Sequence, residues 1–303
     1  MEKGVLVLVL WGLALVLADQ AFVGVSSNGS LVLDPAGGQV LVDGVVFRSL
    51  VDRLDAVERQ WAGHYQRCTI VADTTTISGL SGTGKWVGVV VAGNDKIYGI
   101  PNDQDSVLII DPATDSVDTT TMKNLAGNSK WRGGVLANGR IYGIPFSSES
   151  VLIIDPATNT TDITTITGLA GNGKWADGVL ASTGKIYGTP YDSTSVLIID
   201  TIANTADTTT ISGLDETPGK WTSGVLAHNG KIYGIPLFHD SVLIIDPTTD
   251  TADTTTITGL GKNSKKWQGG VLADNGKIYG IPCGSSAVLT IDPATNTADH
   301  TAI

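Results

Sequence analysis

Short apolar runs separated by turn residues fill the chain after residue 70. One stretch shows the pattern: KWADGVLA (174–181), KIYGTP (185–190), SVLIID (195–200) and TADTTTI (205–211) follow each other with only a few turn residues between them. The runs are rich in Val, Ile, Thr and Tyr, which are enriched in strands, and none has the period of an amphipathic helix. We therefore predict four consecutive antiparallel strands in this stretch.

This four-strand pattern recurs along the chain. A tryptophan opens each copy, and successive tryptophans stand 44 to 46 residues apart: Trp86, Trp131, Trp175, Trp221 and Trp267. One four-stranded sheet cannot bury both of its faces, so copies with this period must pack face to face around an axis. The sequence thus predicts an all-β fold, a β-propeller of four-stranded antiparallel blades over residues 71–303.

The copies of the individual strands set the expected number of blades. The first three strands occur five times, whereas the fourth occurs six times, beginning at Ala72, Val117, Thr161, Ala206, Ala252 and Ala298. Five blades is the main prediction, with the last blade completed either by the strand at 72–77 or by ADHTAI (298–303). A six-bladed ring with one damaged blade is the alternative, because SLVLDPAGGQVLV (30–42) resembles a third strand, a turn and a fourth strand.

Two kinds of turn connect the strands. The pairs Asn138-Gly139, Asn229-Gly230 and Asn275-Gly276 predict two-residue hairpins, because both residue types tolerate positive φ. Asp-Pro-Ala-Thr at 111–114, 155–158 and 292–295 predicts Asx-type turns between the third and fourth strands. These aspartates come one per blade without a second carboxylate nearby, so we predict no metal site.

The repeat resembles the strand grammar of YVTN and NHL propellers. The matching stretches are GKIYGIP and SVLIIDPAT, and the resemblance spans residues 71–303. Kelch repeats are a looser match, since Trp131 precedes the pair Gly133-Gly134. The number and length of the units, each opened by a tryptophan, also look like the five-bladed tachylectin-type lectins. These resemblances imply a propeller and carry no individual residue over.

The residues before the repeats begin with a segment typical of a secretory signal peptide. Lys3 precedes the apolar run 5–17, and cleavage is expected after residue 18, before Asp19. The run is too short to cross a bilayer comfortably, although an uncleaved signal anchor is the alternative. The mature chain is therefore expected to be secreted and free of the membrane.

Two further segments precede the propeller. Residues 19–44 form a short β-rich or irregular segment. Residues 45–66 are predicted to form an amphipathic helix, because its apolar residues alternate in steps of three and four. The helix either lies on the propeller or, through 45–61, forms a short coiled-coil stalk that joins chains into a homo-oligomer.

If the chain is secreted, four other residues are candidates for covalent modification. Asn28 and Asn159 begin glycosylation sequons. Cys68 and Cys283 are the two cysteines, and a secreted chain is able to join them, although spacing alone does not bring them together.

Charge narrows the range of partners. The net charge is −11 and the isoelectric point about 4.6. An acidic surface repels phosphate backbones and anionic membranes, so nucleic acid is not expected as a partner.

Comparison between the copies separates a constant rim from a variable one. The turns between strands one and two and between strands three and four repeat closely. The loops between strands two and three and the entries to the first strands differ in every copy. Loops held by a rigid scaffold commonly carry function, so the variable rim is the predicted binding surface, although unconstrained drift explains the variation equally well. Its candidate residues are Arg132, Asp177, Tyr191, Asp192, Phe238, His239 and Asp240.

The tryptophan ring offers a second candidate surface. A lysine precedes each of Trp86, Trp131, Trp175, Trp221 and Trp267, as Lys130 and Lys174 illustrate. Aromatic faces stack on sugars and lysine bonds hydroxyls, which predicts a multivalent lectin with one site per blade. The alternative interpretation is that the large rings simply pack between blades.

Enzyme motifs are not apparent in the sequence. No histidine recurs, and no nucleophile elbow, zinc helix or phosphate loop is present, so we predict neither catalytic residues nor a cofactor. The main prediction is a secreted binding module for a protein or glycan on the variable rim. The alternatives are the per-blade lectin and a hydrolase or lyase with a single site at the propeller axis.

Overall fold

The computed structural model describes residues 75–262 and 265–301, together with the backbone of six short strands in the first 46 residues. The chain divides into two compact units, Met1–Asp73 and Thr74–Ile303. The described strands of the first unit form three antiparallel pairs. They are β1 (Leu6–Leu10) with β2 (Leu13–Leu17), β3 (Phe22–Val25) with β4 (Leu31–Asp34), and β5 (Leu41–Val42) with β6 (Val45–Val46).

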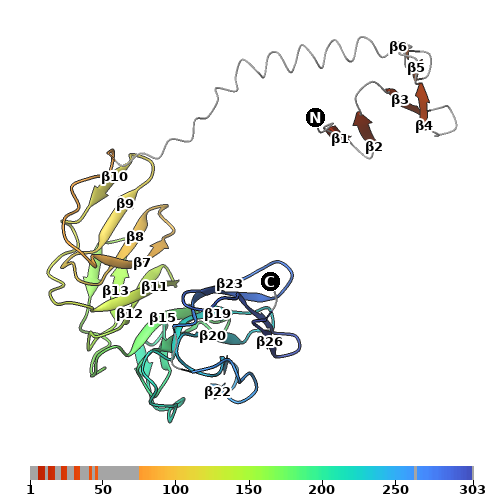
Figure 1. Cartoon of the computed structure of the whole chain (residues 1–303). Helices are drawn as coiled ribbons and strands as arrows, with labels where there is room; N and C mark the ends of the chain where they lie inside the picture. Colours follow the sequence, from red (N-terminus) through yellow and green to blue (C-terminus); the bar gives the residue numbers. More distant parts are fainter. Residues whose placement is uncertain are drawn as a thin grey trace. The chain divides into compact units, whose positions relative to one another are not determined.

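The second unit consists of five four-stranded antiparallel sheets, which are the blades of a β-propeller (Figure 1). In each sheet the four strands lie side by side in chain order. Blade 1 is β7 (Trp86–Val91), β8 (Ile97–Pro101), β9 (Leu108–Asp111) and β10 (Ser116–Asp118). Blade 2 is β11 (Trp131–Ala137), β12 (Arg140–Pro145), β13 (Leu152–Asp155) and β14 (Thr160–Asp162). Blade 3 is β15 (Trp175–Leu180), β16 (Lys185–Pro190), β17 (Leu197–Asp200) and β18 (Thr205–Asp207).

The last two blades have the same architecture. Blade 4 is β19 (Trp221–Leu226), β20 (Ile232–Pro236), β21 (Leu243–Asp246) and β22 (Thr251–Asp253). Blade 5 is β23 (Trp267–Leu272), β24 (Ile278–Pro282), β25 (Leu289–Asp292) and β26 (Thr297–Asp299). The predicted all-β propeller of five four-stranded blades is therefore confirmed. Strand β26 completes blade 5, so the C-terminal residues rather than the segment at 72–77 supply its fourth strand.

Consecutive blades pack through two apolar faces that alternate along each strand. We call the face that meets the next blade the front face and the face that meets the preceding blade the back face. In blade 2 the front face carries Val135, Tyr142, Ile144, Val151 and Ile153. It packs on the back face of blade 3, which carries Trp175, Ile186, Leu197 and Ile199. Because side chains alternate sides along a strand, every second residue of KIYGIP serves one junction and the rest serve the other.

Four tryptophans lie inside these junctions. Trp131, Trp175, Trp221 and Trp267 are buried, and each indole N–H donates to a backbone carbonyl of its own blade. The packing interpretation of the tryptophan ring therefore describes these residues. Trp86 of blade 1 is only partly buried, because no blade precedes it in the described chain.

The constant rim fastens one blade to the next. The hydroxyl of Tyr142 donates to Asn204 of blade 3 at 2.9 Å, and that of Tyr233 donates to Asn296 of blade 5 at 2.7 Å. Both asparagines adopt positive φ in the turn before the fourth strand. The repeated tyrosine is thus a junction residue whose polar end reaches the neighbouring blade.

The turns confirm one prediction and correct another. Asp155 accepts a hydrogen bond from the N–H of Ala157 at 3.0 Å, as an Asx turn requires, and the other Asp-Pro-Ala copies do the same. Asn138-Gly139 is a two-residue hairpin with both residues at positive φ. Asn229-Gly230 and Asn275-Gly276 are not, since only their glycines have positive φ and each asparagine instead donates to a tyrosine hydroxyl.

The ends of the row of blades are not packed like the internal junctions. Strand β23 does not pack on β7 as successive first strands pack on each other. On the front face of blade 5, Val271 is 56% exposed and Ile281 is 52% exposed, whereas the same positions are buried in blade 4. On the back face of blade 1, Val89 is 67% exposed and Val91 is 61% exposed.

Several predictions for the first 74 residues lie outside the described residues. The helix at 45–66, Asn28 and Cys68 belong here, except that Val45–Val46 form strand β6 rather than helix. The signal peptide stays a prediction for residues 1–18, of which only strands β1 and β2 are described. Cys283 is exposed in the described part. Among the described residues no helix is long and apolar enough to cross a membrane.

We expect Trp221→Ala to lower the free energy of unfolding by about 3–5 kcal/mol, because it removes a fully buried ring and leaves a cavity between blades. Trp86→Ala is the matched control, since the same residue type lies half-open at the end of the row. Its cost should be clearly smaller in denaturant unfolding followed by circular dichroism. Equal costs for the two variants would show that the junction is not what holds the tryptophan.

Candidate binding site on the loop rim

The variable rim gathers three segments of each blade. Trp131 pairs with Pro145 across β11 and β12, so the entry to the first strand lies beside the loop between the second and third strands. The segment that links each fourth strand to the next blade runs along the same edge, because the N–H of Leu169 donates to Glu149 and that of Leu214 donates to Thr194. The predicted binding surface is therefore one continuous rim of loops.

The lysines that precede the tryptophans lie under this rim and donate hydrogen bonds to the backbone carbonyls of its loops. The ammonium of Lys130 is buried and donates to the carbonyls of Asn102, Gln104 and Gly127 at 2.9, 2.8 and 2.7 Å. Lys174 does the same with Phe146, Ser148 and Gly171 at 3.3, 2.9 and 2.6 Å. Each lysine thus joins the loop of one blade to the next blade, and burial lowers the pKa of Lys174 to about 8.

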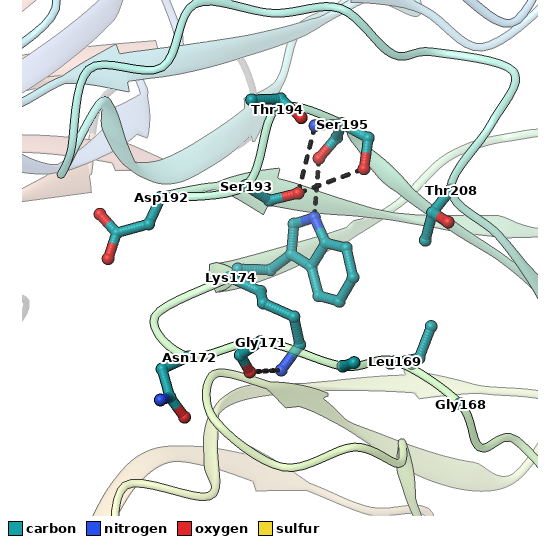
Figure 2. A pocket seen from close by; sticks show the side chains of 12 residues that line it. Gly168, Leu169, Gly171, Asn172, Lys174, Asp192, Ser193, Thr194, Ser195 and Thr208 are labelled. Atoms are coloured by element: carbon teal, nitrogen blue, oxygen red, sulfur yellow. Dashed lines mark hydrogen bonds between the residues drawn. The ribbon is translucent and has the colours of Figure 1, made fainter.

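A cavity of about 520 Å³ lies beside one of these lysines (Figure 2). The Trp175 indole N–H donates to the backbone carbonyl of Ser195 at 2.8 Å. Figure 2 shows the Lys174 ammonium directed at Gly171. Ser193 Oγ accepts from the N–H of Ser195 at 3.1 Å. These polar groups of the wall therefore already have partners within the fold, which leaves few to recognise a ligand.

A row of aromatic rings crosses the rim over blades 2 to 4. The guanidinium of Arg132 lies 3.5 Å above the centre of the Phe146 ring, and the centres of Phe146 and Tyr191 are 5.5 Å apart. Tyr191 and Phe238 both lie against Gly219, where a Cβ would meet Phe238 at 2.7 Å and Tyr191 at 3.3 Å. Stacking of a cation on one ring and tilted packing of the next are both favourable arrangements.

The far end of this row is a pocket of about 500 Å³. Tyr191, Asp192, Thr217, Pro218, Gly219 and Phe238 line it. Asp192 accepts a hydrogen bond from the N–H of Gly219 at 2.7 Å, which holds the linker of blade 4 against the loop of blade 3. We use the name aromatic row for the rings of Phe146, Tyr191 and Phe238 together with the two charged residues beside them, Arg132 and Asp192. Its pocket is of the size that small ligands use.

Unpaired polar atoms accompany the row. Arg132 Nε, Thr222 Oγ1 and Ser223 Oγ are buried and have no hydrogen-bond partner within the described chain. All three belong to entries of first strands, in blades 2 and 4. Buried polar groups are normally bonded, so such atoms indicate a place where a ligand or water completes the bonding.

Asp177 carries a desolvated carboxylate at the same strand entries. Its carboxylate accepts from the N–H groups of Gly178 and Gly224, and its Oδ1 leaves no room for a side chain at Gly133. Burial outweighs these hydrogen bonds and raises the pKa of Asp177 to about 6.

Two predicted candidates have roles inside the loops instead. His239 Nδ1 accepts from the N–H of Ser241 at 3.2 Å, taking the place that a serine Oγ has in blades 2 and 3. Burial lowers the pKa of His239, consistent with a neutral ring. Asp240 accepts from the N–H of Gly261 at 2.7 Å and so holds the next linker.

Sequence reasoning placed Arg132, Tyr191, Asp192 and Phe238 on this rim, and the structure brings all four together with Phe146. Phe146 was not selected, although it occupies the same loop position as Tyr191, and that equivalence was the available signal. Lys130, Lys174 and the four buried tryptophans lie beneath the rim, where their rings and ammonium groups are engaged within the fold. Among the described residues no cluster of metal-ligating side chains is present.

The sequence matches no protein-family model and no curated protein. Its fold is similar to that of solved β-propellers. Virginiamycin B lyase from Staphylococcus aureus is 9% identical, with 72% of this chain and 70% of that chain covered, at a TM-score of 0.57. The extracellular domain of the putative one component system BT4673 from B. thetaiotaomicron is 10% identical at a TM-score of 0.54, with 75% of this chain and 32% of that chain covered. At these identities the likeness concerns the fold alone.

We expect Asp177→Asn to stabilise the protein at pH 7 by on the order of 2 kcal/mol, since it removes a carboxylate that burial disfavours. A carboxyl whose pKa is raised by folding stabilises the native state most below its unfolded pKa of about 4, and that contribution is lost as the pH rises to about 6. The variant should therefore lose the fall in stability between pH 4 and 6 in denaturant titrations. An unchanged pH profile would contradict the assignment.

Proposed function

We propose that this protein is a secreted binding module that holds a glycan partner on the aromatic row of its variable rim. The observation that carries the proposal is the row itself, where Arg132, Phe146, Tyr191 and Phe238 from three blades line up beside a pocket of about 500 Å³. Aromatic faces stack on the apolar faces of sugar rings, and the arginine and strand-entry hydroxyls supply donors for sugar oxygens.

The proposed site is single and asymmetric. Blades 2 and 3 place Phe146 and Tyr191 directly after the proline of the second strand, and blade 4 places Phe238 one residue further on, after Leu237. Blade 1 has Asn102 and blade 5 has Cys283 directly after that proline. The proposed site therefore differs from a lectin with one equivalent site per blade. A protein partner that inserts a side chain into the same pocket is the remaining alternative for this surface.

Secretion is the second part of the proposal. The apolar run that follows Lys3 supports export, and the fold also occurs in an extracellular domain, that of BT4673. Asn159 lies exposed in a turn at positive φ, which is an accessible place for a glycosylation acceptor.

We expect a glycan array of neutral and uronic-acid oligosaccharides to show binding that Tyr191→Ala and Phe238→Ala each weaken by about 2- to 10-fold, because losing a stacked ring costs roughly 0.5–1.5 kcal/mol. Ile202→Ala is the control, since Ile202 is 85% exposed in a turn on the constant rim. Binding that survives both rim substitutions would contradict the proposed site.

We expect the protein expressed with its first 18 residues to appear in the culture medium with Asp19 as its first residue. N-terminal sequencing of the secreted material measures this directly. Retention in the membrane fraction with residues 1–18 intact would instead indicate the signal anchor.

A further inference from the structure

The guanidinium of Arg132, at one end of the aromatic row, keeps donors that the fold does not occupy. Its Nε is buried and has no hydrogen-bond partner in the described part of the chain. None of the ion pairs found between described residues involves Arg132. The lysines under the rim differ, since the ammonium groups of Lys130 and Lys174 each donate to three backbone carbonyls. Arg132 is therefore a cation available to a ligand.

The stack on Phe146 orients these donors. Arg132 is the second residue of β11, where a β-bulge separates it from Gly134, and it pairs with Ile144 of β12. Its guanidinium lies 3.5 Å above the centre of the Phe146 ring. A guanidinium stacked on a ring keeps its N–H groups at the edge of its plane, where they reach a ligand beside the ring. The first strands of the other blades have uncharged residues at this position, which are Val87, Ala176, Thr222 and Gln268.

Burial makes a carboxylate the favoured partner of this guanidinium. Desolvation lowers the pKa of Arg132, so its charged form is held at a cost that a ligand anion compensates and a neutral hydroxyl does not. A carboxylate also offers two oxygens that match the guanidinium fork. The carboxylates of the protein nearby, Asp103 and Asp192, instead accept from the backbone N–H groups of Ser129 and Gly219, at 2.7 Å each.

The pocket at the other end of the row carries the opposite charge. Asp192 is exposed and lines this pocket beside the rings of Tyr191 and Phe238. A carboxylate accepts hydrogen bonds from sugar hydroxyls and repels a second carboxylate. Tyr191 connects the two ends, because it lines the pocket and its ring also packs against Phe146. The row therefore favours an acidic unit at the end near Arg132 and a neutral unit in the pocket.

We propose that the aromatic row binds an acidic oligosaccharide in one orientation, with a uronic-acid carboxylate on the guanidinium of Arg132 and a neutral sugar in the pocket beside Asp192. This inference rests on the proposed glycan-binding function and adds the class of glycan and its direction along the row. Phe146 and Tyr191 supply apolar faces for the sugar rings. The net charge of −11 opposes long-range attraction of an acidic glycan, so recognition depends on the local contact with Arg132.

Titration calorimetry on the full chain tests the class of glycan. One probe is an oligosaccharide of alternating uronic-acid and neutral units, and the second is the same oligosaccharide with its carboxyl groups reduced to alcohols. The reduced probe should bind ~10- to 100-fold more weakly, because it loses the charge-assisted hydrogen bonds to Arg132. Equal affinities for the two probes would overturn this inference and leave glycan binding intact. Absence of binding by both would overturn the proposed function, and this inference with it.

Substitution of the arginine tests which residue reads the carboxylate. Arg132→Gln should reduce the preference for the alternating probe over the reduced probe to a ratio of about 1, since the charge-assisted bonds are gone. Arg132→Lys should not restore the preference, because an ammonium lacks the planar fork. Arg140→Gln is the matched control: it is the same change in the same blade, at an exposed residue of the constant rim paired with Asp155. A preference that survives in Arg132→Gln, or that is lost equally in Arg140→Gln, would overturn the proposal.

A third probe, an oligosaccharide of uronic acid alone, tests the orientation. It should bind the unaltered protein ~3- to 10-fold more weakly than the alternating probe, because one of its carboxylates meets Asp192. Asp192→Asn should remove this difference, since the amide oxygen still accepts from the N–H of Gly219 while the charge is gone. Equal binding of the two probes to the unaltered protein, or a difference that persists in Asp192→Asn, would overturn the proposed orientation.

Discussion

The close approach of one blade's apolar side chains to a glycine in the next blade's first strand is the contact on which the propeller depends. In blades 2 to 5 a glycine lies where a Cβ would come within 2.6–2.8 Å of a carbon of the preceding blade. The missing side chain lets two sheets approach until their apolar faces exclude water. Each tryptophan then fills the space at the edge of the junction, with its single polar atom bonded to a carbonyl. The positions of glycine and tryptophan in each first strand follow from these two requirements, the close approach of the sheets and the filling of the junction edge.

A rigid junction explains why one rim repeats and the other varies. On the constant rim the tyrosine hydroxyl must reach the turn of the next blade, so a left-handed asparagine or aspartate recurs before each fourth strand. On the variable rim the bonds come from the lysine ammonium to backbone carbonyls. Carbonyls are present whatever the side chain, so the loops keep their shape while residues such as Phe146 and Tyr191 differ between blades.

Periodic features could be predicted from the sequence, and unrepeated ones could not. Strand order, blade number and the turn at Asp155 follow from local patterns that occur in several copies. The packing of Phe146 of blade 2 against Tyr191 of blade 3 depends on how two blades are rotated against each other, which no local pattern encodes. His239 shows the same limit: an imidazole beside an aspartate suggests chemistry, yet its Nδ1 replaces a serine hydroxyl in a turn. Asn229 was assigned to a hairpin because its side-chain bond to Tyr233 was not foreseeable.

The departures from the repeat are therefore the informative positions. An aromatic residue in the loop after the repeated proline leaves the junction unchanged, because the lysine below it bonds only the backbone. Such residues in three adjacent blades, Phe146, Tyr191 and Phe238, create a surface. Val89 is a departure of another kind, because it stands where blades 2 to 5 have the junction glycine, and it therefore alters the packing face itself. At any internal blade this valine would force two sheets apart, whereas blade 1 has no blade before it among the described residues and tolerates the change. The two departures from the repeat therefore act at different places: the aromatic residues change the surface of the variable rim, and Val89 changes the packing face at the end of the row.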